Sequence, residues 1–196
     1  SRKVKKMEQI HSATDKSGKT IVITGATSGI GLAAASELAR QGADVIGVGR
    51  SARNCASAEA GIRRENPRAR IRFLQADLSS LRQVRQLAAN LRSLLPDGLD
   101  VLVNNAGTVS NWYTATEDGY ELQFAVNHLA GFLLAHELLP ELRRSPGGRV
   151  LTTSSGSHRN TRMRWRDVMF RHGYQILLAY KQSKLANVLF SAEFNR

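Results

Sequence analysis

Short apolar runs alternate with longer stretches of helical periodicity along most of the chain. Five of the short runs are predicted to be strands, at Thr20–Thr24, Val45–Val48, Ile71–Gln75, Leu99–Val103 and Arg149–Thr153. They show little alternation between apolar and polar residues, which indicates strands that are covered on both faces.

The longer stretches have apolar residues at the 3.6-residue spacing of a helix. Gly42 marks the end of the first of these helices, because glycine commonly follows a helix C-terminus. Pro140 is expected to kink or interrupt the fourth, because proline lacks the backbone N–H that a helix interior needs. The predicted helices are Ile30–Gln41, Ser51–Glu65, Ser79–Leu95, Gly119–Arg144 and Leu177–Phe194.

This alternation of strands and helices predicts a doubly wound, three-layer α/β fold. Strands joined by crossover helices pair in parallel, and we expect the strand order 3-2-1-4-5. A ligand is then expected beyond the carboxyl ends of the first and fourth strands, where the sheet changes direction. One domain is expected over residues 18–196, preceded by a basic extension over residues 1–17.

The amino-acid composition of the chain argues against some classes of function. The 196 residues include 28 Lys and Arg against 16 Asp and Glu, a formal net charge of +12. The basic residues are spread over many segments, and the clusters at 2–6 and 159–171 do not interleave aromatic residues. We therefore interpret them as a solvated face rather than a nucleic-acid site, with an anionic ligand or a membrane surface as alternatives. The one cysteine, Cys55, excludes an internal disulfide and a multi-cysteine metal site.

Membrane insertion and secretion are not expected from this sequence. No apolar run approaches the roughly 20 residues of a membrane span, and the basic start has no apolar stretch behind it. These features predict a cytoplasmic location. No metal site is expected among the residues singled out below.

The turn after the first strand, residues 24–31, reads T-G-A-T-S-G-I-G. Glycines there would let the backbone approach a pyrophosphate, and the next helix would direct its positive end at that group. The spacing is neither the common G-x-G-x-x-G pattern nor a P-loop, so a purely structural glycine turn is the alternative. Arg50 ends the second strand in place of a carboxylate, which favours the 2′-phosphate of NADP(H) over the ribose of NAD(H). The alternative for Arg50 is an ordinary surface arginine.

Tyr180 and Lys184 are candidate reactive residues, because positions four apart share one helix face. A nearby ammonium lowers the pKa of a tyrosine from its usual value of about 10 and makes it a better acid–base catalyst. Ser154 and Ser155 follow the fifth strand, and strand alternation predicts that one of them alone faces the ligand. His158 lies nearby, but no orienting carboxylate accompanies it, so a serine hydrolase is disfavoured.

Two further motifs follow strands. Asp77-Leu78 comes after the third strand, where a carboxylate can accept a hydrogen bond from an adenine amine, and Asn104-Asn105-Ala106-Gly107 comes after the fourth. Taken in this order, the motifs resemble those of the short-chain dehydrogenase/reductase family, whose fold is Rossmann-type. Residues 118–124, 126–129 and 183–187 are most similar to the retinol-dehydrogenase-like branch. The resemblance covers residues 18–196.

The resemblance implies a role for each matching residue. Tyr180 would be the general acid or base, Lys184 would lower its pKa and bind ribose hydroxyls, and Ser155 would polarise the substrate carbonyl. Asn127 would hold a water in a proton relay. The implied cofactor-binding residues are Gly25, Ser28, Gly29, Ile30, Gly31, Arg50, Asp77, Leu78, Asn105, Ala106, Gly107, Tyr180 and Lys184.

The expected function is hydride transfer between NADP(H) and a carbonyl or alcohol substrate, expected to be lipophilic. A catalytically silent dinucleotide-binding sensor or scaffold is the alternative. By family resemblance, a homodimer or homotetramer is expected. Tyr180 follows Ser155 by 25 residues, and we expect this long insert to border the substrate cleft. The family's last two strands and substrate loop are absent from this sequence, which predicts a truncated chain.

Overall fold

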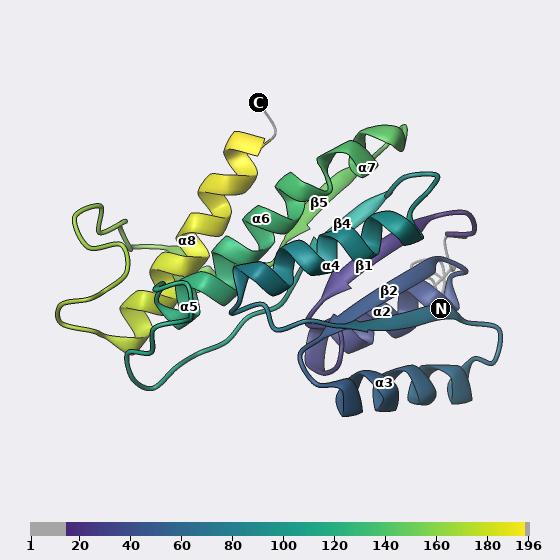
Figure 1. The fold of residues 1–196 in the computed structure, drawn as a ribbon, viewed down its shortest axis with the longest axis horizontal. Coiled ribbons are helices and arrows are strands. Elements are labelled where there is room, and N and C mark those ends of the chain that lie inside the picture. Colours follow the sequence, from purple (N-terminus) through teal and green to yellow (C-terminus); the bar gives the residue numbers. More distant parts are fainter. Residues whose placement is uncertain (1–14, 195–196) are drawn as a thin grey trace, which may run out of the picture.

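The computed structural model describes residues 15–194, so most of the predicted basic extension lies outside the described residues. A single parallel sheet occupies the centre (Figure 1), and its order is β3-β2-β1-β4-β5, which confirms the prediction. Neighbouring strands pair in parallel register, as in Ile21 with Val45 and Ile21 with Val101. The strands are β1 (Thr20–Thr24), β2 (Asp44–Gly49), β3 (Arg70–Gln75), β4 (Val101–Asn104) and β5 (Arg149–Thr152).

Helices cover both faces of the sheet, because alternate strand residues are apolar on each side. Ile21 and Ile23 of β1 pack with α2 (Gly29–Arg40) and α3 (Ala52–Glu65). Val22, between them, packs on the opposite face with α4 (Leu81–Leu94) and α6 (Ala130–Glu137). The last helix, α8 (Ile176–Phe194), lies beside α6 on this second face (Figure 1).

The predicted helix Gly119–Arg144 is wrong as a single element. Residues before Leu122 form a turn in which Gly119 has a positive φ of +79°, a conformation that ends helical geometry. The helical region then comprises α5 (Leu122–Phe124), a π-helical turn η1 (Ala125–Leu129), α6 and α7 (Leu139–Arg144). Pro140 lies in the first turn of α7, where its missing N–H costs nothing, so the predicted interruption is confirmed. All other predicted strand and helix boundaries lie within two residues of those observed.

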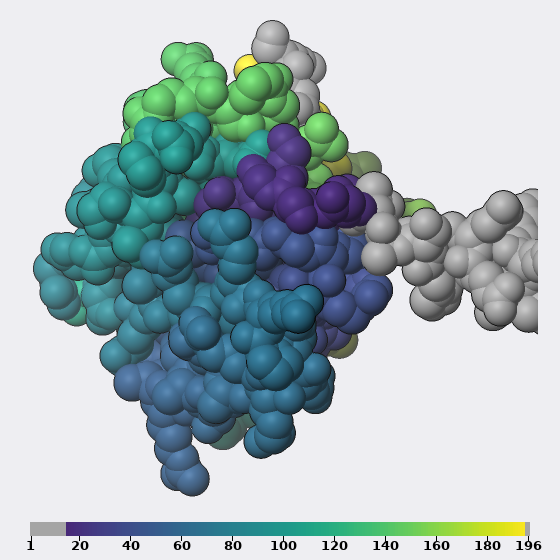
Figure 2. Space-filling model, turned by 90° about the vertical axis from the view of Figure 1, so that its right-hand side faces the viewer, coloured from purple at the N-terminus to yellow at the C-terminus, as the bar shows by residue number. Residues whose placement is uncertain are grey.

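Figure 2 shows the side of the molecule at which the strands begin. The purple segment that leads into β1 lies at the centre of this face, between the blue β2–β3 region and the green turn before β5. Asp100 secures this segment, because its carboxylate accepts hydrogen bonds from Lys19 Nζ at 2.8 Å and from the backbone N–H of Thr20 at 2.9 Å. The loops that form the site lie on the opposite side, where the strands end. Within residues 15–194, no helix is both long enough and apolar enough to cross a bilayer.

Candidate active site

A cavity of about 710 Å³ lies at the carboxyl ends of the strands, where the reversal of strand order was expected to place a ligand. Loops after all five strands contribute to its walls, together with two side chains from α8. Two of the predicted site residues, Gly29 and Asn127, do not line it. Those that do are Gly25, Ser28, Ile30, Gly31, Arg50, Asp77, Leu78, Asn105, Ala106, Gly107, Ser155, Tyr180 and Lys184.

The glycine turn depends on missing Cβ atoms at two positions. Gly25 has φ +66°, and a Cβ there would lie 2.8 Å from the Cα of Ala106. A Cβ on Gly31 would collide with the carbonyl oxygen of Gly25, so α2 and the turn after β1 approach too closely for any side chain. The first turn of α2 contains no acidic residue, and its cap Ser28 makes no side-chain hydrogen bond to the helix. The N–H groups and positive dipole end of α2 therefore suit the pyrophosphate of a dinucleotide.

Tyr180 and Lys184 face the same cavity from α8, as their spacing predicts. The ammonium Nζ of Lys184 lies 5.6 Å from the centre of the Tyr180 ring. Lys184 is buried, with 4% of its surface exposed, and burial lowers the pKa of its ammonium. Its Nζ donates one hydrogen bond within the described residues, to the Thr153 carbonyl at 3.2 Å, so two further N–H donors can serve a ligand.

Both serines after β5 line the cavity, contrary to the expectation from strict strand alternation. The reason is that β5 ends at Thr152, and the backbone beyond it no longer follows the pleat of the sheet. The Ser154 hydroxyl donates to the carbonyl of Lys184 at 2.7 Å and is thereby occupied. The Ser155 hydroxyl accepts from the N–H of Ser157 at 3.2 Å, which leaves its proton for another acceptor. Ser155 is therefore the better candidate for contact with a substrate oxygen.

Asn127 acts on the cavity indirectly. It lies in η1, is 5% exposed, and its side chain bonds both the N–H of Thr108 at 2.7 Å and the Thr108 carbonyl at 3.0 Å. A Cβ on Gly107 would lie 3.3 Å from Nζ of Lys184 and 3.5 Å from Oδ1 of Asn127. The two side chains therefore converge at Gly107, and Asn127 fixes the backbone beside the ammonium. The predicted water relay through Asn127 stays a prediction.

Arg50 and Asp77 both line the cavity, and they follow the neighbouring strands β2 and β3. Arg50 is exposed, and its carbonyl accepts a bond from Nε2 of Gln75 at 3.3 Å. Oδ1 of Asp77 accepts from the N–H and hydroxyl of Ser79 at 2.9 and 2.8 Å. No hydrogen bond within residues 15–194 involves the other carboxylate oxygen, which suits an acceptor for an adenine amine.

Comparison with known proteins shows the family of this chain. Residues 19–166 match the family model described as short chain dehydrogenase. The chain belongs to the short-chain dehydrogenase family. It is 39% identical over 180 residues to "Retinol dehydrogenase 13" from Homo sapiens, an alignment covering 91% of this chain and 54% of that protein. It is 41% identical over 184 residues to "Polyprenol dehydrogenase" from Mus musculus, with coverage of 91% and 54%. The chain thus spans about half the length of these relatives.

A solved structure supports the same assignment. The "Pseudomonas aeruginosa RhlG/NADP active-site complex" superposes with a TM-score of 0.73 at 31% sequence identity. The match covers 92% of this chain and 67% of that chain.

No residue of the arginine-rich insert, residues 156–175, lines this cavity, and the expectation that the insert borders the substrate cleft stays a prediction. Met163, Trp165 and Val168 instead line a separate apolar groove of about 370 Å³ against η1, α6 and α8. The backbone of the insert is held by buried Gln182, which accepts from the N–H of Arg164 at 2.8 Å and donates to the Val168 carbonyl at 2.7 Å. A buried glutamine of α8 thus fixes the backbone of the insert at two points.

Sequence reasoning missed Thr24 as a site residue. Its Oγ1 accepts hydrogen bonds from the N–H groups of Asn105 and Ala106, at 3.0 and 3.1 Å, and so joins the end of β1 to the loop after β4. The amide of Asn105 also donates to the Thr24 carbonyl at 3.1 Å. The signal available was the position of Thr24 immediately before the glycine turn.

Proposed function

We propose that this chain binds NADP(H) and catalyses hydride transfer between that cofactor and a lipophilic carbonyl or alcohol compound. The observation that carries the proposal is the convergence of three features on one cavity: the glycine turn, Ser155 and the Tyr180–Lys184 pair. Retinol and polyprenol, which the names of two relatives mention, are apolar alcohols and support the proposed substrate class.

The described residues fit a nicotinamide dinucleotide along the cavity. The glycine turn and the N-terminus of α2 would hold the pyrophosphate, with Arg50 at a 2′-phosphate and Asp77 at the adenine amine. Residues 105–107 would border the nicotinamide, which supplies or accepts the hydride when the cofactor is bound. The NADP in the RhlG complex supports NADP(H) as the cofactor.

Three side chains would handle the proton and the substrate oxygen. Tyr180 donates its phenolic proton to the carbonyl oxygen during reduction and accepts it in the reverse direction. The buried Lys184 ammonium stabilises the phenolate, because an adjacent positive charge favours the ionised form of an acid. Ser155 donates a hydrogen bond to the same substrate oxygen and so polarises the carbonyl.

The test is Tyr180→Phe, which removes one hydroxyl and keeps the ring. We expect kcat to fall by about 100-fold or more, the usual contribution of a positioned acid. The Kd for NADPH, measured by fluorescence titration, should remain within about twofold of wild type, because the ring still forms the cavity wall.

Unchanged turnover in Tyr180→Phe contradicts the mechanism. Wild-type protein that binds NADPH but reduces no ketone or aldehyde, and oxidises no alcohol with NADP⁺, supports the non-catalytic sensor or scaffold instead.

A homodimer or homotetramer is part of the proposal. It is supported by exposed apolar side chains on the outer helices, with Phe132 of α6 49% exposed and Leu189 of α8 45% exposed. A cytoplasmic location is also proposed, since Cys55 is a free, buried thiol of the kind that persists in a reducing compartment.

A further inference from the structure

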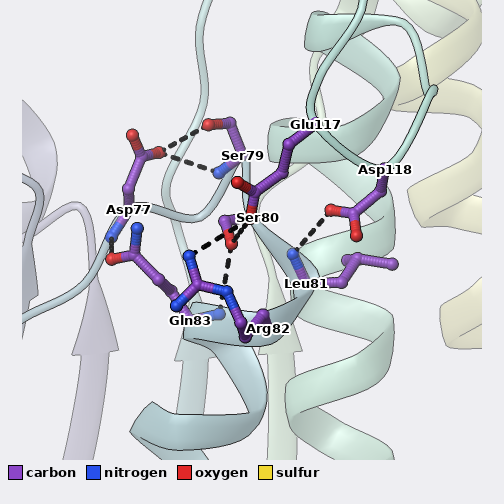
Figure 3. A network of polar contacts seen from close by, with 8 residues as sticks. All are labelled: Asp77, Ser79, Ser80, Leu81, Arg82, Gln83, Glu117 and Asp118. Carbon is purple, nitrogen blue, oxygen red and sulfur yellow. Dashed lines mark hydrogen bonds and ion pairs between the residues drawn. The ribbon is translucent and has the colours of Figure 1, made fainter.

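The N-terminus of α4 is capped by residues from a distant loop. Its own first turn contains no acidic residue, and its cap Ser80 accepts from the N–H of Gln83 at 3.3 Å. Two carboxylates approach it from the segment before α5 (Figure 3). Asp118 Oδ2 accepts a hydrogen bond from the N–H of Leu81 at 2.9 Å, and Oε1 of Glu117 accepts one from the Ser80 hydroxyl. The loop thus supplies the negative charge that stabilises a helix N-terminus.

A tight turn holds these two acids in place. The N–H of Thr116 donates to the Tyr120 carbonyl at 2.8 Å, and the N–H of Gly119 donates to the Thr116 carbonyl at 2.9 Å. Gly119 has φ +79°, which other residues rarely adopt. Glu117 and Asp118 therefore lie at the tip of a closed turn, directed at α4.

The same end of α4 fixes Asp77, whose carboxylate faces the cavity. The N–H of Asp77 donates to Oε1 of Gln83 at 3.0 Å, and its carbonyl accepts from the N–H of Ser80 at 3.2 Å. Figure 3 shows this arrangement, with Asp77 on one side of the helix start and the two capping acids on the other. The orientation of Asp77 thus depends on the first turn of α4 being formed.

We propose that Glu117 and Asp118 are positioning residues for the adenine end of the cofactor cavity. Without them, two N–H or O–H donors at the start of α4 lose their acceptors, and the first turn of the helix frays. Gln83 and Ser80 then no longer fix Asp77 toward the adenine. The inference rests on the proposed function, because it presumes that the cavity binds NADP(H).

The experiment measures binding at the two ends of the cofactor cavity separately. Adenosine 2′,5′-bisphosphate probes the adenine end, and reduced nicotinamide mononucleotide probes the other end. In Asp118→Ala we expect the Kd for adenosine 2′,5′-bisphosphate and for NADPH to rise by about fivefold. This is the change in an equilibrium constant that corresponds to the free energy of one lost helix cap. The Kd for reduced nicotinamide mononucleotide should be unchanged. Hydrogen exchange at the amides of Asp77 and Leu81 should become faster by a similar factor.

Two matched variants distinguish capping from charge. Asp118→Asn keeps an acceptor for the N–H of Leu81 and should restore adenosine 2′,5′-bisphosphate affinity to within about twofold. Arg82→Ala removes the ion pair with Glu117 at 3.6 Å and leaves the caps, and the Arg82 side chain is 76% exposed. It should therefore bind all three compounds as wild type does.

Three outcomes would overturn the inference while leaving the proposed function intact: unchanged adenine-half affinity in Asp118→Ala, equal weakening of both halves, or failure of Asn to restore binding. Wild-type protein that binds neither NADPH nor adenosine 2′,5′-bisphosphate contradicts the proposed function itself. If Asp118→Ala does not fold by circular dichroism, Glu117→Ala carries the same test, because it removes the acceptor of the Ser80 hydroxyl and leaves the bond between Leu81 and Asp118 in place.

Discussion

Burial changes the pKa of one side chain in the site, that of Lys184. Its ammonium is buried beside the Tyr180 ring, and burial holds its pKa below the usual value of 10.5. The folded state therefore binds fewer protons than the unfolded state between that lowered pKa and 10.5. In this window the free energy of unfolding contributed by Lys184 rises as the pH rises.

Lys184→Met tests this linkage, because methionine fills similar space without a titrating group. We expect the free energy of unfolding of wild type, relative to the variant, to increase as the pH is raised from 7 toward 10.5. Urea unfolding at several pH values provides the measurement. Parallel pH profiles for the two proteins would show that the pKa of Lys184 is the same in both states.

Arg50 is the residue on which the choice of cofactor depends. It ends β2, lines the cavity and is exposed. Arg50→Ala should raise the Kd for NADPH by about tenfold or more, because a charge-assisted bond to the 2′-phosphate is lost. The Kd for NADH should change little. Arg53→Ala, an exposed arginine on α3 outside the cavity lining, is the matched control, and an equal loss for both cofactors in Arg50→Ala argues against a 2′-phosphate contact.

Among the elements, α4 is the one whose buried face follows most directly from its sequence. Val84, Leu87, Ala88 and Leu91 are buried, as the 3.6-residue spacing predicts. By contrast, the break between α6 and α7 was predicted from Pro140 alone, while the π-turn η1 has no local signal. The turn before α5 was missed although Gly119, whose φ of +79° ends helical geometry, gives a local signal. Its contact with α4, through Asp118 and Leu81, joins residues 37 positions apart.

Leu91→Ala tests the contribution of the apolar face of α4. Leu91 is fully buried in the core between α4, the sheet and α6, so its truncation leaves a cavity. The free energy of unfolding should fall by about 2–5 kcal/mol. Gln86→Ala, on the exposed face of the same helix, should change it by less than about 0.5 kcal/mol. Denaturant unfolding measures both, and equal effects would mean that α4 does not pack as described.

At the scale of the whole molecule, the parallel sheet gathers five loops at one edge, and this produces the cavity. The outer helices leave a second feature, the apolar groove of about 370 Å³ that includes Phe132 and Leu189. Large exposed apolar patches commonly mark association surfaces. We therefore relate the proposed homodimer or homotetramer to this groove.

Phe132→Asp is expected to convert the oligomer to a monomer, because a carboxylate cannot be buried in an apolar interface without a partner. Leu177→Asp is the control, since Leu177 is 67% exposed and does not line the groove. Light scattering coupled to size-exclusion chromatography measures the mass. A monomeric wild type, or an oligomer that Phe132→Asp leaves intact, contradicts the proposal.

The sequence by itself determined the parallel direction of the strands, the apolar faces of the helices and the motifs at the strand ends. Those features depend on local spacing: a period of 3.6 sets a helix face, and the crossover rule sets the direction of the strands. From these features the sequence predicted that Gly25, Asp77, Ser155 and Tyr180 meet at the end of the sheet where the strands terminate. All four line the cavity.

The tertiary structure alone decided contacts between distant segments. Thr24 bonds to the loop after β4, Gln182 bonds to the backbone of the insert, and Asp118 caps a helix that begins 37 positions earlier. Each is a hydrogen bond between groups far apart in sequence, and no periodicity records such a pairing. Whether a polar side chain finds its partner depends on which surfaces the packing of the core brings together.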